Sequence, residues 1–305
     1  MIKPNALRPG GSIGIVAPSG PADPDELNRG MERLRAMGFR VIPSESVFGR
    51  DRFLSGTDRQ RAADLNRMFS DPQIAAIVCA RGGYGSARLL PHLDEAAIAQ
   101  NPKIIVGSSD VTVLLNHLGQ RHGFVTFHGP MVAPNFGRAP SALTDAWFQK
   151  ILVEGLGGGP IAVEGVKALR GGRAEGPLSG GCLTMICSTL GTPYEVRTEG
   201  TILLLEDVNE APYRIDRMLT HLKAAGKLKG VRGVVFGRMP GCHPPDAAGY
   251  SLEDVIREAL ADQSFPILYG FPAGHGDGQV TLPLGVPVRI DGNEAALSLL
   301  EAGVV

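Results

Sequence analysis

Short apolar runs alternate with amphipathic segments along the first 130 residues of the chain. The apolar runs have the length of buried strands and end in turn residues, at residues 12–20, 39–44, 74–80 and 103–107. Apolar residues recur at helical spacing in the segments between and after them, at residues 23–39, 57–71, 86–93 and beyond residue 110. Asp23 and either Thr57 or Asp58 stand where helix caps belong. Alternating strands and helices predict a parallel sheet covered by helices.

The pattern breaks around residues 137–175, which are rich in glycine and proline, and then resumes. Buried strands and amphipathic helices alternate again over residues 201–278, and short β segments follow at 280–303. A chain of 305 residues is large for one core. We therefore expect an α/β fold with two domains. These are an N-terminal domain with a doubly wound parallel sheet (1–150), a Gly/Pro-rich connection (151–175), and a C-terminal α/β domain with short β segments (176–305).

Composition and charge narrow the class of partner. The sequence is 43% hydrophobic and 20% charged with a formal net charge of −1, which gives no reason to expect nucleic acid or an anionic membrane as partner. No run of eighteen apolar residues occurs, and the first twenty residues lack an apolar segment of signal-peptide type. We expect a cytoplasmic protein.

The residues that commonly bind metals lack metal-binding spacing. The four cysteines form no C-x-x-C pair, and Cys79 lies inside an apolar run. His117 and His122 are five residues apart on a predicted helix, so they do not share a face as i, i+4 ligands would. We expect neither a bound metal nor a cofactor.

Polar residues gather where four apolar strands end. These groups are R-G-G-Y-G at residues 81–85, G-S-S-D at 107–110, E-D at 206–207 and G-H-G-D-G at 274–278. In open α/β sheets, ligands bind at the edge where the strands have their carboxyl ends. Together the groups supply a hydroxyl, a carboxylate, an imidazole and a glycine-rich turn, which is the inventory for nucleophilic acyl transfer.

The serine and glycine groups each have a second interpretation. Ser108, Ser109 or Asp110 would serve as an ordinary N-cap of the following helix, and the G-x-S-x-G fingerprint of α/β-hydrolases is absent. The glycines at 81–85 would merely end a strand, or cradle a phosphate, although neither common phosphate-binding glycine motif is present.

The imidazole and the carboxylate are equally ambiguous. His275 lies between glycines and would be a plain surface residue of a loop. Glu206 closes an apolar strand and needs a partner there, which Arg214 or Arg217 would provide through a salt bridge. The residues taken one at a time leave these alternatives open.

Taken together, seven motifs resemble those of one family in their order along the chain. The family is the LD-carboxypeptidases, serine peptidases that include muramoyltetrapeptide carboxypeptidase and the microcin C immunity peptidases. The resemblance extends from residue 13 to about residue 286. The motifs are IGIVAPSGP, ARGGYGSARLL, VGSSDVTVLLN, FHGPM, GGCLTMICSTLGTPYE, ILLLEDVNEAPYRIDRMLTHL and GFPAGHGDGQVTLPLG.

The resemblance implies a catalytic triad of Ser109, Glu206 and His275. It also implies an oxyanion hole made of the backbone N–H of Asp110 and that of Gly82, with Gly83 as the less favoured donor. Arg81, beside the glycines, is a candidate for binding the free carboxylate of the substrate. The chain departs from the family pattern at Ser108, where an aromatic residue is frequent, and this adds a second hydroxyl next to Ser109.

The activity implied by the resemblance is removal of a terminal D-alanine from murein tetrapeptides during peptidoglycan recycling, by a cytoplasmic homodimer that needs no cofactor. Within the family, the alternative is a microcin-type peptidase acting on a peptidyl- or aminoacyl-nucleotide, although the sequence has no clear counterpart of the nucleotide-recognising elements. Two alternatives come from other classes. One is a nucleotide-dependent kinase, suggested by the glycine-rich turn, and the other is a non-enzymatic two-domain binding protein for small ligands.

Overall fold

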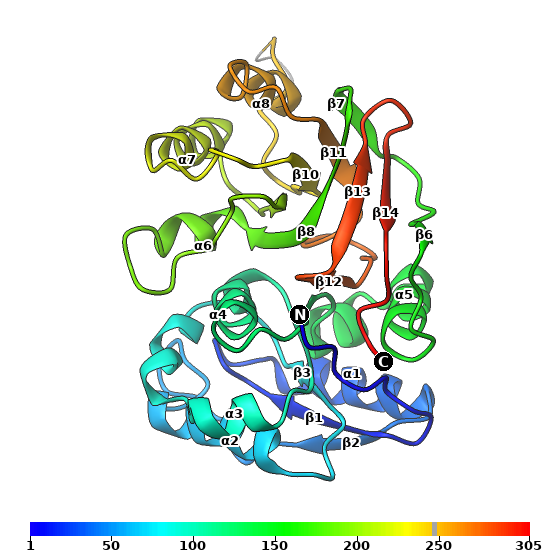
Figure 1. Ribbon diagram of the computed structural model, residues 1–305. Helices are drawn as coiled ribbons and strands as arrows, with labels where there is room; N and C mark the ends of the chain where they lie inside the picture. Colours follow the sequence, from blue (N-terminus) through cyan, green and yellow to red (C-terminus); the bar gives the residue numbers. More distant parts are fainter. Residues whose placement is uncertain (246–248) are drawn as a thin grey trace. The chain divides into compact units, whose positions relative to one another are not determined.

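The computed structural model describes residues 1–245 and 249–305, which form two compact units (Figure 1). Unit 1 contains residues 1–156, 277–284 and 302–305, and unit 2 contains residues 157–276 and 285–301. The chain thus leaves unit 1, builds most of unit 2 and returns. The predicted boundaries at residues 150 and 176 place one connection between two continuous domains, whereas the compact units are interleaved along the sequence.

Unit 1 contains a six-stranded sheet with the order β12-β5-β4-β3-β1-β2. The first five strands along the chain pair in parallel, and β12 runs antiparallel to β5 at one edge. Strands β1, β3 and β4 are buried along their whole length, as their apolar runs predict. The strands are β1 Ser12–Val16, β2 Arg40–Pro43, β3 Ala76–Cys79, β4 Ile104–Gly107, β5 Thr126–His128 and β12 Leu282–Leu284.

The helices of unit 1 pack against one another and against strands of the sheet. Helix α1 packs against the π-helix η3, and α2 packs against α3 and η1, while α4 packs against η1 and strands β4 and β5. Phe148 of α5 contacts Phe39 just before β2 and Phe136 of η3. Their bounds are α1 Pro24–Ala36, α2 Asp58–Ser70, α3 Glu95–Gln100, α4 Thr112–His122 and α5 Ala142–Leu152, with the 3₁₀ helices η1 Ser86–His92 and η2 Ser109–Val111 and the π-helix η3 Val132–Arg138.

Local signals in the sequence explain where the first helices begin. The carboxylate of Asp23 accepts hydrogen bonds from the N–H groups of Asp25 and Glu26, and Thr57 forms a capping box with Gln60. The predicted helix at residues 86–93 is a 3₁₀ helix, η1, and not an α-helix, with Pro91 inside it. Proline lacks the N–H that a continuing α-helix needs, which accounts for the difference.

The order of the strands creates a switch point in unit 1. Strand β1 lies between β2 and β3, so the chain moves in opposite directions across the sheet after β1 and after β2. The loops that follow β1 (residues 17–20, here the β1 loop) and β3 (residues 81–85, here the glycine turn) both leave the sheet at this point. Ligands bind at such switch points in open α/β sheets.

Unit 2 contains an eight-stranded mixed sheet with the order β6-β14-β13-β8-β9-β10-β11-β7. Strands β8 to β11 are parallel, and an apolar cluster packs strands β9, β10 and β11 against helices α6, α7 and α8. The strands are β6 Gly159–Pro160, β7 Lys167–Arg170, β8 Arg173–Cys182, β9 Ile202–Glu206, β10 Gly233–Gly237, β11 Ile267–Phe271, β13 Pro287–Asp291 and β14 Ala296–Leu299. The helices are α6 Leu183–Ser188, α7 Pro212–Ala224 and α8 Leu252–Ala259. The expected α/β class, with a doubly wound first sheet and short β segments near the end, is confirmed.

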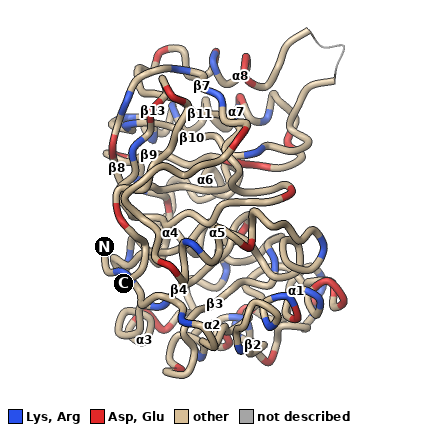
Figure 2. The backbone as a smooth tube through the Cα atoms, turned by 90° about the vertical axis from the view of Figure 1, so that its right-hand side faces the viewer, with Lys and Arg blue, Asp and Glu red and all other residues tan. Residues whose placement is uncertain are grey.

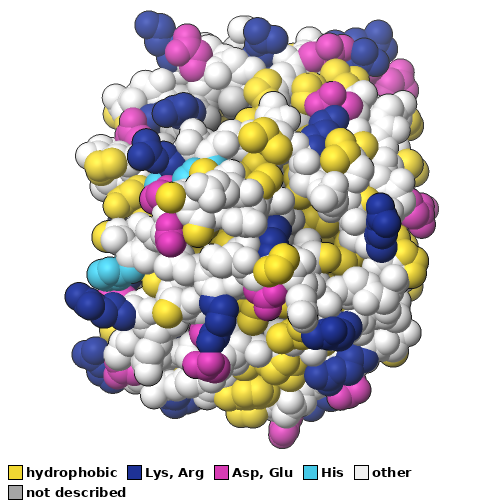
Figure 3. Space-filling model, turned by 60° about the horizontal axis from the view of Figure 1, so that its bottom comes forward, with side chains coloured by type: hydrophobic (Ala, Val, Ile, Leu, Met, Phe, Trp, Pro, Cys, Tyr) yellow, Lys and Arg dark blue, Asp and Glu magenta, His cyan; other side chains and the backbone are white. Residues whose placement is uncertain are grey.

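Charged residues of both signs are mixed along each unit. Figure 2 shows basic and acidic positions interspersed along the chain, and on the face drawn in Figure 3 their side chains lie next to each other. Many form ion pairs, such as Arg33 with Asp145 in unit 1 and Arg173 with Asp291 in unit 2. Among the described residues, the helices lack the length and apolar character that crossing a membrane requires.

Candidate active site

The chain turns sharply at Ser109, directly after strand β4. Ser109 has a φ of +58°, in the left-handed region that residues with a side chain seldom adopt. Its side chain is partly exposed, whereas the neighbouring Ser108 is buried. Neither Ser108, before η2, nor Val111, before α4, makes a side-chain capping hydrogen bond in this described segment. The helix-cap interpretation therefore does not account for these residues, and the turn presents Ser109 rather than Ser108.

Asp110 anchors this turn (residues 107–110, here the serine turn) to two other loops. Its side chain is 1% exposed, and Oδ2 accepts hydrogen bonds from Ser19 Oγ at 2.5 Å and from the Ser86 N–H at 2.8 Å. The hydroxyl of Ser86 donates to the carbonyl of Asp110 at 2.5 Å. Ser19 belongs to the β1 loop, and Ser86 follows the glycine turn. A buried carboxylate is stable only with such partners, so the three segments hold one another in place.

Gly82 lies against the side chain of Ser109. A Cβ atom at position 82 would stand 2.9 Å from Ser109 Oγ and 3.5 Å from the Asp110 nitrogen, so only glycine fits beside this hydroxyl. The carbonyl of Gly82 accepts a hydrogen bond from the Gly20 N–H at 3.2 Å. Gly83 is exposed with a φ of +113°, and the exposed Arg81 donates from Nη1 to the carbonyl of Pro21 at 3.1 Å. Unit 1 thus brings Ser109, Asp110 and Gly82 together.

Glu206 and His275 form a hydrogen-bonded pair in unit 2. Glu206 ends strand β9 with a fully buried side chain, and His275 follows strand β11. One carboxylate oxygen, Oε2, accepts from the His275 backbone N–H at 3.1 Å and lies 2.7 Å from Nδ1. Gly274 has a φ of +85°, and a Cβ there would stand 2.1 Å from the same oxygen. His275 is therefore held in place by Glu206 and is not a plain surface residue.

The environment of His275 favours its charged form. Burial of the imidazole alone would lower its pKa, but the hydrogen bond and the negative charge of Glu206, with a further contribution from Asp207, raise the pKa above the ordinary histidine value. Arg214, one of the partners considered for Glu206, pairs with Glu210 instead. A histidine hydrogen-bonded through Nδ1 to a buried carboxylate keeps Nε2 for proton transfer, as the base of a catalytic triad does.

Asp207 points away from this pair and caps a helix. Its Oδ2 accepts from the N–H of Thr184 at 2.9 Å and from the Thr184 hydroxyl at 2.8 Å, in the first turn of α6. The alternation of side chains along a strand predicts that Glu206 and Asp207 face opposite ways. The sequence places Asp207 shortly before helix α7, which predicts that its charge lies near the start of that helix. In the structure, the carboxylate instead caps helix α6.

Two histidines of unit 1 meet at one carboxylate. Glu95 Oε1 lies 3.0 Å from His117 Nε2, and Oε2 lies 2.7 Å from His122 Nε2. Burial of the His122 ring lowers its pKa, although Glu95 opposes this shift. Within residues 1–245 and 249–305, no set of three His, Cys, Asp or Glu side chains has an arrangement that could hold a metal ion.

Bacterial proteins named as murein peptide carboxypeptidases match nearly the whole chain. The sequence is 36% identical over 304 residues to the probable murein peptide carboxypeptidase of Bacillus subtilis, covering 99% of this chain and 95% of that one. It is 33% identical over 291 residues to the murein tetrapeptide carboxypeptidase of Pseudomonas aeruginosa, covering 93% and 94%. The solved structure of the microcin C7 self-immunity protein MccF in complex with aspartyl sulfamoyl adenosine matches with a TM-score of 0.94 at 28% identity, covering all of both chains.

Two family profiles match the two halves of the sequence. The profile of the LD-carboxypeptidase N-terminal domain matches residues 13–129, and that of the C-terminal domain matches residues 175–290. These matches, with the relatives above, define the protein as a serine-type carboxypeptidase, a hydrolase. The chain belongs to the LD-carboxypeptidase family. The resemblance found in the seven motifs is confirmed, and the kinase and the non-enzymatic binding protein are set aside.

Proposed function

We propose that the protein hydrolyses the L-D peptide bond of murein tetrapeptides and releases the terminal D-alanine. The relatives from B. subtilis and P. aeruginosa, named for murein peptides, support this substrate class. The observation that carries the assignment to Ser109 is its left-handed turn, which presents the hydroxyl beside the backbone of Gly82. A strained strand-to-helix turn of this kind exposes a nucleophile and places the next N–H where an oxyanion can receive it.

In the proposed reaction, Ser109 Oγ attacks the carbonyl carbon of the L-D bond while His275 takes the hydroxyl proton. Glu206 orients the imidazole and stabilises its charged form. The N–H groups of Asp110 and Gly82 stabilise the oxyanion, each typically worth about 10²–10³ in rate. The C–N bond then breaks, and the departing D-alanine takes the proton from His275. Water, deprotonated by His275, hydrolyses the acyl-enzyme.

This assignment requires Ser109 of unit 1 and His275 of unit 2 to act on one substrate carbonyl. Both domains of the LD-carboxypeptidase family match this one chain, with Ser109 in the first match and His275 in the second, which supports that requirement. For the free carboxylate of the substrate, we assign Arg81 and the Gly83 N–H as binding groups. Arg81 is exposed and adjoins Gly82, and a guanidinium suits a carboxylate.

We further propose a cytoplasmic enzyme of peptidoglycan recycling that works as a homodimer, as the family resemblance implies. The four cysteines are free thiols, which suits a reducing compartment. Fractionation of cells and sedimentation of the purified protein would test the location and the oligomeric state.

The experiment that tests the substrate is mass spectrometry of a peptide panel incubated with the enzyme. The panel contains the L-D tetrapeptide, the same tetrapeptide ending in L-alanine, the tripeptide, and an aspartyl sulfamoyl nucleoside. We expect loss of D-alanine from the first compound only. Cleavage of the L-alanine peptide at an equal rate would contradict the proposal.

The second candidate is a microcin-type peptidase. The observation in its favour is the match to MccF, whose structure in complex with aspartyl sulfamoyl adenosine superimposes with a TM-score of 0.94. Cleavage of an aminoacyl-nucleotide amide in the same panel, with the murein peptides left intact, would establish this candidate in place of the first.

A further inference from the structure

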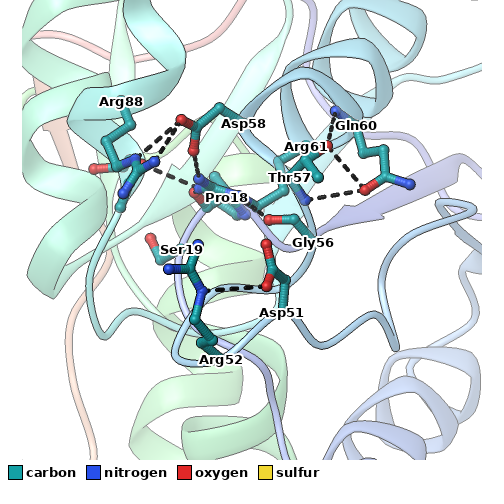
Figure 4. Close-up of polar contacts among 12 residues, drawn as sticks. Pro18, Ser19, Asp51, Arg52, Gly56, Thr57, Asp58, Gln60, Arg61 and Arg88 are labelled. Carbon is teal, nitrogen blue, oxygen red and sulfur yellow. Dashed lines mark hydrogen bonds and ion pairs between the residues drawn. The ribbon is translucent and has the colours of Figure 1, made fainter.

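A buried arginine contacts the loops that hold the serine turn. Arg61 is on helix α2, and its side chain is 0% exposed. Its guanidinium contacts three backbone carbonyls and one carboxylate (Figure 4). Nε donates to Gly56 at 3.1 Å, Nη1 donates to Gly85 at 3.0 Å and also to Pro18, and Nη2 donates to Asp58 Oδ1 at 2.5 Å.

Two of these carbonyls belong to peptide groups that lead directly to Asp110. The carbonyl of Gly85 and the N–H of Ser86 are the two ends of one peptide group. Arg61 donates a hydrogen bond to the Gly85 oxygen of that group, and the Ser86 N–H of the same group donates to the Asp110 carboxylate. One planar peptide is therefore held at both ends. This peptide group therefore links the Arg61 guanidinium to Asp110, whose own backbone N–H is assigned to the oxyanion hole.

The second connection runs through the β1 loop. The Pro18 carbonyl that Arg61 binds immediately precedes Ser19, whose hydroxyl donates to Asp110 Oδ2. Gly20, the next residue, donates its N–H to the carbonyl of Gly82. Both proposed oxyanion donors, Gly82 and Asp110, are thus attached to a loop that Arg61 holds.

The counter-ion of Arg61 is itself held in place. Asp58 Oδ2 accepts from Nε and Nη2 of Arg88 at 3.0 Å and 2.9 Å, and Arg88 lies on η1, just beyond the glycine turn (Figure 4). Burial lowers the pKa of Arg61, whereas the charge and hydrogen bond of Asp58 oppose that shift. A buried guanidinium needs all its donors matched, because an unpaired buried charge is strongly destabilising.

We propose that Arg61 is a positioning residue for catalysis, which sets the oxyanion hole by holding the β1 loop and the glycine turn through their carbonyls. The inference rests on the proposed function, in which Ser109 is the nucleophile and the N–H groups of Gly82 and Asp110 form the hole. Only arginine suits this position, because its planar fork donates in several fixed directions at once, whereas lysine offers a compact charge on a flexible stem.

The experiment compares Arg61→Lys with Arg67→Met, the matched control on the same helix. Arg67 forms ion pairs with Asp64 and Glu45, and in the described part of the chain these contacts do not involve the β1 loop or the glycine turn. Steady-state kinetics on the L-D tetrapeptide are normalised to folded protein. They are combined with the affinity of a peptide boronic acid, which forms a tetrahedral adduct with a nucleophilic serine.

We expect Arg61→Lys to lower kcat by about 10–100-fold, because misplacement of catalytic groups by about 1 Å costs rates of this order. KM should stay within about twofold, and the boronic acid should bind more weakly by the same factor as kcat, since only the transition state and its analogue use the hole. Arg67→Met should change neither. Wild-type kcat in folded Arg61→Lys, or equal losses in substrate and boronate affinity, would overturn the proposal.

Two further variants keep the outcome interpretable. If Arg61→Lys does not fold, Asp58→Ala removes the carboxylate partner and leaves the three carbonyl contacts, and it should lower kcat at unchanged KM. Unchanged kcat in folded Asp58→Ala would then count against the proposal. Ser109→Ala tests the proposed function separately. If that variant keeps its activity, the nucleophile is misassigned whatever Arg61 does, whereas an inactive Ser109→Ala beside a fully active Arg61→Lys rejects the role of Arg61 alone.

Discussion

Ser109 obtains its exposure from one backbone angle. Left-handed φ values in residues other than glycine cost about 1–2 kcal/mol, and the turn keeps this strain because Asp110 is hydrogen-bonded to Ser19 and Ser86. Strain that surrounding structure maintains at a polar residue is frequent at active sites. The hydrogen bonds of Asp110 therefore keep Ser109 in this strained conformation.

The strain predicts an ordering of two inactive variants. Ser109→Ala and Ser109→Gly should both lose activity by several orders of magnitude, because each lacks the proposed nucleophile. Only glycine relieves the left-handed strain, so Ser109→Gly should be more stable than Ser109→Ala by up to about 1 kcal/mol. Chemical denaturation of both variants measures the difference. Ser108→Ala is the control and should retain most of the activity. A larger loss of activity in Ser108→Ala would mean that the nucleophile is Ser108.

The Glu206–His275 pair predicts the pH dependence of activity. A base must be neutral to accept a proton, and a raised pKa keeps His275 charged up to a higher pH. The acid limb of kcat/KM should therefore lie above the reference histidine value of about 6.5. In Glu206→Gln, the carboxylate charge is lost and burial then dominates, so the limb should move to lower pH while kcat falls by about 10²–10⁴. An acid limb at the same pH in both proteins would show that another group controls it.

Helix α6 depends on a side chain that follows strand β9 directly in the sequence. Asp207 caps α6 through Thr184, and its carboxylate is buried. Asp207→Asn should lower the free energy of unfolding by about 1–3 kcal/mol, the range for leaving buried hydrogen-bonding groups poorly matched. If Asp207 lay near the start of helix α7, as the sequence suggests, the same substitution would lower the free energy of unfolding by only about 1 kcal/mol or less. Thermal and urea unfolding measure the loss, and kcat of the folded variant should stay close to that of the wild type. Collapse of kcat without loss of stability would instead assign Asp207 to catalysis.

The sequence predicts well those helices and strands that neighbouring residues mark, either by a helix cap or by an uninterrupted apolar run. Helices α1 and α2 begin at Asp23 and Thr57, where the caps are visible in the sequence, and strands β1, β3 and β4 are uninterrupted apolar runs. Helix α5, the short β6 and β7, and the beginning of β8 lie within the stretch whose glycines and prolines mark it as a connection. Their pairing with β11, β13 and β14 depends on residues about a hundred positions away in the sequence, which no local pattern contains.

The same distinction applies to the site. The resemblance supplies Ser109, Glu206 and His275 by motif, and alternation along strand β9 separates Glu206 from Asp207. Arg61 has no such signal. An arginine on an amphipathic helix is usually exposed, and its burial here depends on carbonyls from three loops.

At the scale of the whole molecule, both ends of the chain are part of unit 1. Val305 exchanges backbone hydrogen bonds with the first residues, accepting from the Ala6 N–H at 2.8 Å and donating to the Pro4 carbonyl at 3.0 Å. Val304 is 4% exposed, whereas the side chain of Val305 is 72% exposed. The last residues are thus built into the unit that carries Ser109.

This arrangement predicts different effects for two neighbouring valines. Val304→Ala should lower the free energy of unfolding by about 1–3 kcal/mol, because it removes buried methyl groups. Val305→Ala should have an effect within about 0.5 kcal/mol, as expected for an exposed position. Denaturation of both variants provides the comparison. Equal effects would indicate that the end of the chain does not pack in solution as described.

The return of strand β12 to the sheet of unit 1 limits how the gene can be divided or recombined. A coding segment that ends after residue 156 would lack β12 and leave β5 as an open sheet edge, a template for aggregation. Exchange of C-terminal halves between relatives would also exchange β12, and each new half would have to pair with a β5 strand beside which it did not evolve. Inheritance in this lineage is therefore expected to keep both halves together, with β5 and β12 changing in concert.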